Sequence, residues 1–157
     1  MPIPLCKALL ALAIATSIVF GADNSLGTWK LDVEKSKYTP QPMPVKSLTT
    51  TRELVDRRVK VTTNGERSDG MPINTSYTTL YDGTWSSVPG TGAPYDTISV
   101  KKVNANKFND ERKKLGGSYH AKGVTVISNG GKTMTWTSKG TDSDDKEFTA
   151  TFVYDKQ

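Results

Sequence analysis

The residues best suited to form a binding site are large aromatic side chains and one arginine that fall on predicted strands. Binding sites for small molecules are mostly hydrophobic and carry a few placed polar groups, and this set has that composition. The same side chains would also serve as an ordinary packed core, so a ligand cavity and a filled interior both stay open. The candidates for a cavity wall are Tyr77, Trp85, Trp136, Phe148, Phe152, Tyr154 and Arg52.

Arg52 is the candidate for a positive group inside the protein. It has the strand parity of Leu48, Thr50 and Leu54, so it shares a face with two apolar side chains. An unpaired arginine is more often at the surface, and the opposite orientation, toward water, is therefore the alternative.

No constellation of residues predicts catalysis, a metal site or a cofactor. His120 is the single histidine, and neither a nucleophile motif nor metal ligands at suitable spacing accompany it. The stretch 141–146 resembles the start of a calcium loop, but Lys146 replaces a ligand and Val153 stands where the bidentate glutamate belongs. We therefore interpret 141–146 as a polar hairpin turn and His120 as a strand residue on an exposed face.

The first 21 residues have the pattern of a secretory signal peptide. Lys7 supplies a positive start, an apolar run over 8–20 follows, and Gly21 offers a small residue for cleavage. A retained membrane anchor is the alternative, although the run is short for a bilayer span. Cys6 is the only cysteine and precedes the run, so a mature chain of residues 22–157 would have no disulfide and no thiol. We expect a helical leader, then one domain in the periplasm or outside the cell.

The charge of the chain does not indicate a nucleic-acid partner. The formal net charge of +5 is mild, and the acidic residues Asp56, Asp110 and Glu111 directly precede the basic clusters at 57–60 and 112–114. We interpret these mixed runs as solvated hairpin ends. A monomer without nucleic acid and without a stable membrane anchor after cleavage is expected.

The elements that must position the candidate residues are strands. Gly27 begins the first one, in which Trp29 and Leu31 share a face. The triple-proline stretch 34–44 predicts an extended loop, because proline fits neither a ladder nor a helix interior. Threonine-rich and β-branched runs separated by turn residues then predict strands at 47–54, 59–63, 73–81, 84–88, 96–103, 107–115, 119–128, 133–139 and 147–154, with an open loop at 89–94.

The last three predicted strands show the clearest alternation. Met134 and Trp136 share one side of their strand, and Phe148, Phe152 and Tyr154 share one side of the final strand. The opposite sides are mostly threonine, which favours the solvent face. The chain is thus predicted to be all-β, an antiparallel up-and-down barrel of about eight to ten strands, with a two-sheet sandwich as the alternative.

The start of the first strand resembles that of a known family. Gly27-Thr28-Trp29-Lys30-Leu31 carries the Gly-x-Trp of the calycin group, which includes lipocalins and fatty-acid-binding proteins, and the chain is most similar to small secreted bacterial lipocalin-like proteins. The resemblance implies a barrel with an internal cavity. Two family features are missing: Phe152-Val153-Tyr154 stands where fatty-acid-binding proteins have Arg-x-Tyr, and no arginine after Arg112 is available to cover Trp29.

The function that these patterns favour is a non-catalytic extracytoplasmic barrel that binds a small apolar molecule. The alternative is a secreted or envelope-associated barrel without a cavity that acts through its surface loops, especially residues 38–43 and 89–95. Enzymatic activity is a third hypothesis, since barrels of this kind can host catalysis.

The leader generates the first testable prediction. The protein exported by a bacterial host should begin at Ala22 or within a few residues of it, because signal peptidase cleaves after the small residue that ends the apolar run. Intact-mass spectrometry of the envelope and medium fractions measures this directly. A mass that retains residues 1–20 would contradict cleavage and favour the membrane anchor.

Overall fold

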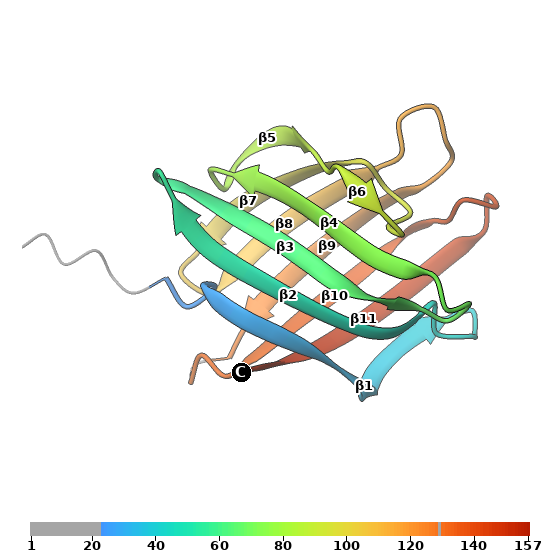
Figure 1. Ribbon diagram of the computed structural model, residues 1–157, viewed down its shortest axis with the longest axis horizontal. Coiled ribbons are helices and arrows are strands. Elements are labelled where there is room, and N and C mark those ends of the chain that lie inside the picture. Colours follow the sequence, from blue (N-terminus) through green and yellow to red (C-terminus); the bar gives the residue numbers. More distant parts are fainter. Residues whose placement is uncertain (1–22, 129) are drawn as a thin grey trace, which may run out of the picture.

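The computed structural model describes residues 23–128 and 130–157, and this part of the chain is all-β. The predicted signal peptide, residues 1–21, lies outside the described residues. Among the described residues, no helix has the length and apolar character needed to cross a membrane. Eleven antiparallel strands form a single sheet that curls into a near-barrel (Figure 1), as the alternation of the sequence predicts.

The strands follow one another as a meander. They are β1 (Gly27–Thr39), β2 (Val45–Val55), β3 (Arg58–Arg67), β4 (Pro72–Thr79), β5 (Asp82–Ser87), β6 (Gly90–Thr91), β7 (Thr97–Asn104), β8 (Lys107–Lys113), β9 (His120–Ile127), β10 (Thr133–Thr141) and β11 (Glu147–Lys156). Their order in the sheet is β5-β7-β8-β9-β10-β11-β1-β2-β3-β4-β6. Because all of them belong to one sheet, the two-sheet sandwich is excluded.

The two ends of the sheet approach each other where β4 passes β5. Ser86 Oγ donates to the Thr78 carbonyl at 2.8 Å, and Ser76 N donates to the Pro89 carbonyl at 3.2 Å. A closed barrel has no free edges, so these bonds reduce the open edge that a curled sheet would otherwise present.

The first strand is longer than predicted. Residues 34–39, assigned to the proline loop in our prediction, belong to β1, because the prolines begin only at Pro40. The pairing of β1 with β11 shifts register between Asp32 and Lys37. There Ser36 Oγ donates to the Asp32 carbonyl at 2.6 Å and accepts from Val153 N at 3.0 Å, which holds this irregular segment on the sheet. The predicted open loop at 89–94 likewise contains the two-residue strand β6, which pairs with β4.

One end of the barrel is filled by its own side chains. Trp29, Ile98, Phe108 and Ile127 are almost completely buried there. Trp29 Nε1 donates to the Ser25 carbonyl at 2.9 Å, and the Ser25 and Tyr81 hydroxyls lie 3.2 Å apart. The segment before β1 therefore closes this end, and its contacts satisfy the polar atom that the buried indole brings with it.

A lysine at the end of β11 lies over the buried ring of Trp29. Lys156 Nζ lies 5.2 Å from the centre of the Trp29 ring, within the range of a cation–π contact. Gly27 has a φ of +119°, and a Cβ on it would lie 2.9 Å from Lys156 Cε. A side chain at position 27 would thus strain the backbone and displace the lysine from the indole.

Trp29 should be the most sensitive position of the closed end. Trp29→Ala removes a side chain that is 0% exposed, so we expect it to lower the free energy of unfolding by about 3–5 kcal/mol. Denaturant midpoints measure the loss, with Lys30→Ala on the exposed face as the control, expected to stay within about 0.5 kcal/mol. A loss below about 1 kcal/mol for Trp29→Ala would show that the closed end does not depend on this residue.

Candidate ligand-binding cavity

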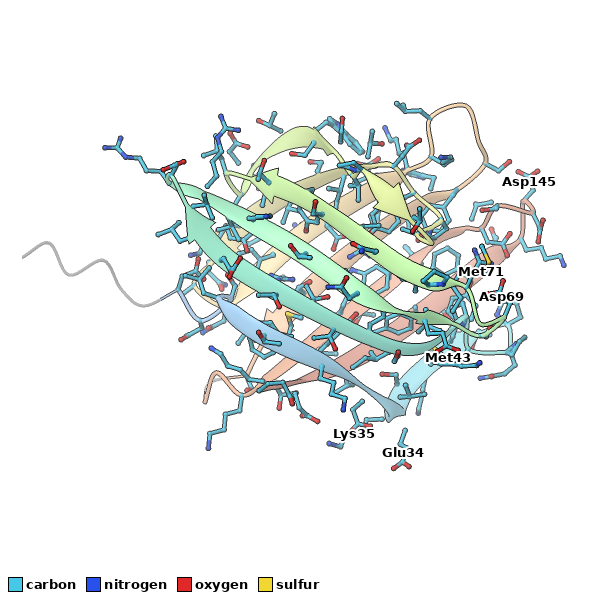
Figure 2. The ribbon with its side chains drawn as sticks, viewed as in Figure 1. Glu34, Lys35, Met43, Asp69, Met71 and Asp145 are labelled. Carbon is cyan, nitrogen blue, oxygen red and sulfur yellow. The ribbon has the colours of Figure 1, made fainter. Side chains whose placement is uncertain are left out.

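A cavity of about 710 Å³ occupies the other half of the barrel. Its mouth is lined by the loop residues Pro44, Tyr95 and Asp142 and by Arg67 at the end of β3. Figure 2 shows Met43, Asp69, Met71 and Asp145 at this same end of the molecule. The volume lies within the range of about 300–1,000 Å³ that is usual for small-molecule sites.

The pairing of strands places the aromatic residues of the last two strands inside. Trp136 and Phe152 are directly opposite each other on β10 and β11, with ring centres 5.4 Å apart in an edge-on arrangement. Met134 pairs with Tyr154 two residues further along. This confirms the faces predicted from alternation, and the outward threonines of the same strands are also as predicted.

Six of the seven predicted wall residues line the cavity. They are Arg52, Tyr77, Trp136, Phe148, Phe152 and Tyr154, which come from β2, β4, β10 and β11. The prediction for Trp85 was wrong: its side chain is 42% exposed, and Lys113 Nζ lies over its ring at 4.3 Å. The pairing of β5 with β7 shifts register between Asp82 and Trp85, so simple alternation assigns Trp85 to the wrong face.

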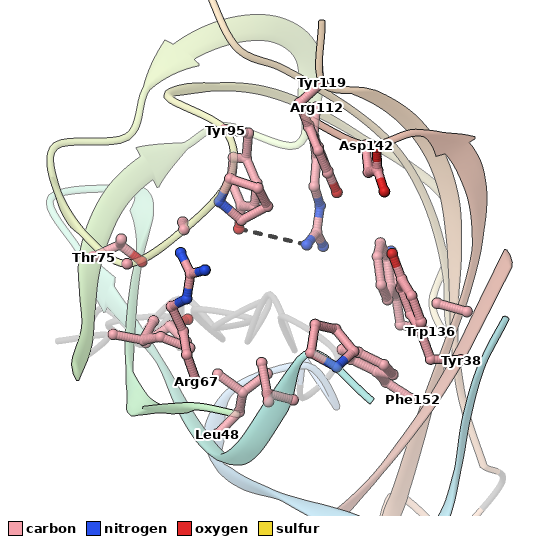
Figure 3. Close-up of a pocket in the computed structure, with 18 of the residues that line it drawn as sticks. Tyr38, Leu48, Arg67, Thr75, Tyr95, Arg112, Tyr119, Trp136, Asp142 and Phe152 are labelled. Carbon is pink, nitrogen blue, oxygen red and sulfur yellow. Dashed lines mark hydrogen bonds between the residues drawn. The ribbon is translucent and has the colours of Figure 1, made fainter. Parts of the chain in front are cut away.

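Three tyrosines that we did not predict complete an aromatic run near the mouth. Tyr38 stacks on Phe148 with ring centres 5.4 Å apart, and Phe148 stacks on Tyr119 at 5.8 Å. Tyr119 in turn stacks on Tyr95 at 6.0 Å. Figure 3 shows Tyr38, Tyr95 and Tyr119 around the cavity with Trp136 and Phe152. These side chains offer flat apolar surfaces with hydroxyl groups, which suits an aromatic ligand.

A buried network of polar groups joins β8 and β10 in the cavity wall. Trp136 Nε1 donates to Asp110 Oδ1 at 2.9 Å, and Arg112 Nε donates to Asp110 Oδ2 at 2.9 Å. Asp110 is only 9% exposed, so its negative charge depends on these two donors. Our interpretation of the run around Arg112 as a solvated hairpin end was therefore wrong for Asp110 and Arg112. Both residues lie on the same inner face of β8 as Phe108.

The Arg112 guanidinium also contacts two aromatic rings. It lies 4.1 Å from the centre of the Trp136 ring and 5.0 Å from that of Tyr95, and one Nη donates to the Tyr95 hydroxyl at 3.4 Å. Burial opposes its charge, but the nearby Tyr95 and Asp110 outweigh this effect and raise the pKa of Arg112. The group is thus a fixed cation in the cavity wall.

Gly123 provides the room for this network. It is opposite Asp110 on β8 and Ser138 on β10, so it lies beneath the indole. A Cβ on Gly123 would overlap Trp136 Nε1 and would lie 2.7 Å from Asp110 Oδ1. A glycine within a strand often marks a place where another group approaches the backbone closely. Gly123 is therefore the residue from which the sequence could have indicated this network.

The remaining walls are partly polar. Thr50, Thr63, Thr75 and Thr125 line the cavity, and the Thr50 and Thr63 hydroxyls lie 3.1 Å apart on β2 and β3. Burial raises the pKa of Tyr154 to about 12 and also raises the pKa of Tyr77. Both phenols therefore stay protonated at neutral pH and can donate hydrogen bonds to a ligand.

His120 lies away from the cavity lining, whereas Asp142 of the 141–146 turn lies at the mouth. His120 Nε2 is 2.7 Å from Glu111 Oε1, and the histidine side chain is 43% exposed. Asp142 Oδ1 accepts from the backbone N of Asp144 and Lys146, as expected of a polar hairpin turn. Within residues 23–128 and 130–157, no three His, Cys, Asp or Glu side chains gather as a metal site would need.

Comparison with known proteins finds similarity at the level of solved structures. No model of a protein family matches the chain, and no curated protein sequence matches it. The structure of EF1p2_mFAP2b bound to DFHBI is similar over 87% of this chain and 96% of its own, at 11% identity and a TM-score of 0.49. A redesigned beta barrel, mFAP1, bound to DFHBI, is similar over 82% and 94%, at 18% identity and a TM-score of 0.39.

The contact of Gly123 with the network can be tested by a double-mutant cycle. Gly123→Ala should lower the free energy of unfolding by about 1–3 kcal/mol, because its Cβ overlaps the Trp136 indole. The cost should shrink in a Trp136→Phe background, where the overlapping nitrogen is gone. Gly130→Ala, where nothing lies within 4 Å, is the control. Additive costs in the double mutant would show that the two residues do not meet.

Proposed function

We propose that this protein is an exported, non-catalytic barrel that binds a small molecule with a flat apolar body in the cavity between β2–β4 and β8–β11. The observation that carries the proposal is the cavity of about 710 Å³ with aromatic walls. A barrel of about eight strands can be filled by its own side chains or can hold one ligand, and here only the closed end is filled.

The distribution of groups around the cavity supports a binding role. Phe148, Phe152 and Trp136 supply apolar surface from β10 and β11, whereas threonines and tyrosines supply separate hydrogen-bonding groups. Sites of this kind gain affinity from the buried apolar area and specificity from the few polar groups. The mouth is built from loops, which gives a ligand a route into the barrel.

Export and the absence of catalysis are parts of this proposal that rest on the sequence. The leader pattern of residues 1–21 favours a periplasmic or extracellular location. The proposal of binding without chemistry follows from the sequence, in which His120 is accompanied by neither a nucleophile motif nor metal ligands at suitable spacing.

Filling the cavity should abolish binding without unfolding the protein. A neutral apolar probe, N-phenylnaphthylamine, should bind at micromolar strength, which corresponds to about −8 kcal/mol, and should quench Trp136 emission. Ala150→Phe places a ring into the cavity from β11, so probe binding should be lost while the denaturation midpoint is retained. Fluorescence titration and denaturant unfolding measure the two quantities.

The matched control is Thr149→Phe, which adds the same ring to the exposed face of the same strand and should leave probe binding unchanged. A packed interior gives the reverse result: the parent binds no probe, and Ala150→Phe destabilises the fold by about 1–3 kcal/mol. That pair of results would refute the binding barrel and favour a role for the surface loops.

A further inference from the structure

We propose that the ligand carries an anionic group, a carboxylate or a comparable acid, and that Arg52 binds this group inside the cavity. The proposal rests on the binding function proposed above and names the chemical class of its ligand. It follows from the contrast between Arg52 and Arg112, since the third arginine of the lining, Arg67, pairs with Asp69 at 3.1 Å.

Arg52 enters the cavity from the middle of the sheet. It is opposite Gly27 on β1 and Val61 on β3, and Val61 is opposite Tyr77 on β4. Val61 is 3% exposed, so this row of residues faces the interior. Along β2, Arg52 comes after Leu48 and Thr50, and therefore lies further from the mouth than either of them.

The Arg52 guanidinium has an unsatisfied donor. Its Nε is fully buried and has no hydrogen-bond partner among the described residues. None of the ion pairs found within residues 23–128 and 130–157 involves Arg52. A buried donor on a charged group without a partner is costly, and proteins rarely keep one without a use for it.

Arg112, in the same cavity, differs from Arg52 because its guanidinium has a carboxylate partner. Its Nε donates to Asp110 at 2.9 Å, and this carboxylate also holds the Trp136 indole. The charge of Arg112 is thus balanced by the protein. Arg52 has no such carboxylate among the described residues, so a bound anion would balance its charge.

Two tyrosine side chains line the cavity together with Arg52. Tyr77 is opposite Val61, which is itself opposite Arg52, and Tyr154 lines the same cavity from β11. Burial raises the pKa of both phenols. As protonated phenols they donate hydrogen bonds, which an anionic oxygen accepts more strongly than a neutral one does.

This arrangement gives the ligand an orientation. Its acidic end lies against Arg52, and its apolar body extends toward the aromatic run of Tyr38, Phe148 and Tyr119 near the mouth. The ligand class is therefore an amphipathic acid with a flat or chain-like apolar part, short enough for a cavity of about 710 Å³.

A pair of probes that differ only in charge tests the assignment. Anilinonaphthalenesulfonate and N-phenylnaphthylamine share one aromatic body, and only the first carries a sulfonate. The wild-type protein should bind the anionic probe at least about tenfold more tightly, as a charge-assisted hydrogen bond in a partly dry site allows. Arg52→Met should remove this preference and leave the affinity for the neutral probe unchanged.

Two further variants separate a binding role of Arg52 from a structural role or a surface effect. Arg58→Met removes the same charge from an exposed position and should leave the preference intact. Arg52→Met should keep or raise the denaturation midpoint, because it removes an unsatisfied donor, whereas Arg112→Met should lower it by removing the cation that balances the buried Asp110 carboxylate. A lower midpoint for Arg52→Met would assign the residue a structural role and overturn the proposal.

The possible failures are distinguishable. If the wild-type protein binds both probes equally well, the cavity binds ligands but the anionic class is wrong. If the preference survives Arg52→Met, the assignment to Arg52 is wrong. If neither probe binds, the proposed binding function fails, and the inference about its ligand fails with it.

Discussion

The buried carboxylate of Asp110 makes the polar interior of this barrel possible. It accepts hydrogen bonds from Trp136 on β10 and Arg112 on its own strand, and so joins two elements through one charged group. A cation stacked on the indole then forms part of the wall without an unbalanced charge. These contacts require a glycine at position 123, because any side chain there would overlap the indole nitrogen of Trp136.

The same alternation of inward and outward side chains gives the barrel one filled end and one hollow end. At the closed end, Trp29 and its neighbours exclude water, and the buried indole N–H is bonded to the Ser25 carbonyl of the segment before β1. Toward the mouth, smaller threonines take the inward positions of β2, β3 and β4, and the interior stays hollow. A rigid filled end of this kind supports the strands that hold the cavity residues in place.

Alternation predicted the inward faces of β10 and β11 from the sequence because these strands are regular and neither is an edge of the sheet. It failed for Trp85, because the pairing of β5 with β7 shifts register before this residue. The side chain therefore lies on the face opposite to the one that alternation predicts. Alternation also passed over Asp110 and Arg112, because charged residues next to a turn ordinarily face water. The partner that makes an inward carboxylate stable, Trp136, is 26 residues away, and that proximity exists only in the folded sheet.

The same reasoning explains why the sequence singled out Arg52 yet left its orientation open. Because Arg52 alternates in step with Leu48, the strand pattern favours an inward side chain, whereas its charge favours an outward one. The local sequence does not show which of the two preferences is stronger. In the folded protein the covered row from Gly27 through Val61 to Tyr77 decides in favour of the interior. An arginine that the sheet places inside without a carboxylate differs in kind from one that the protein neutralises, and this difference is the basis of the proposed selectivity of the cavity for charge as well as shape.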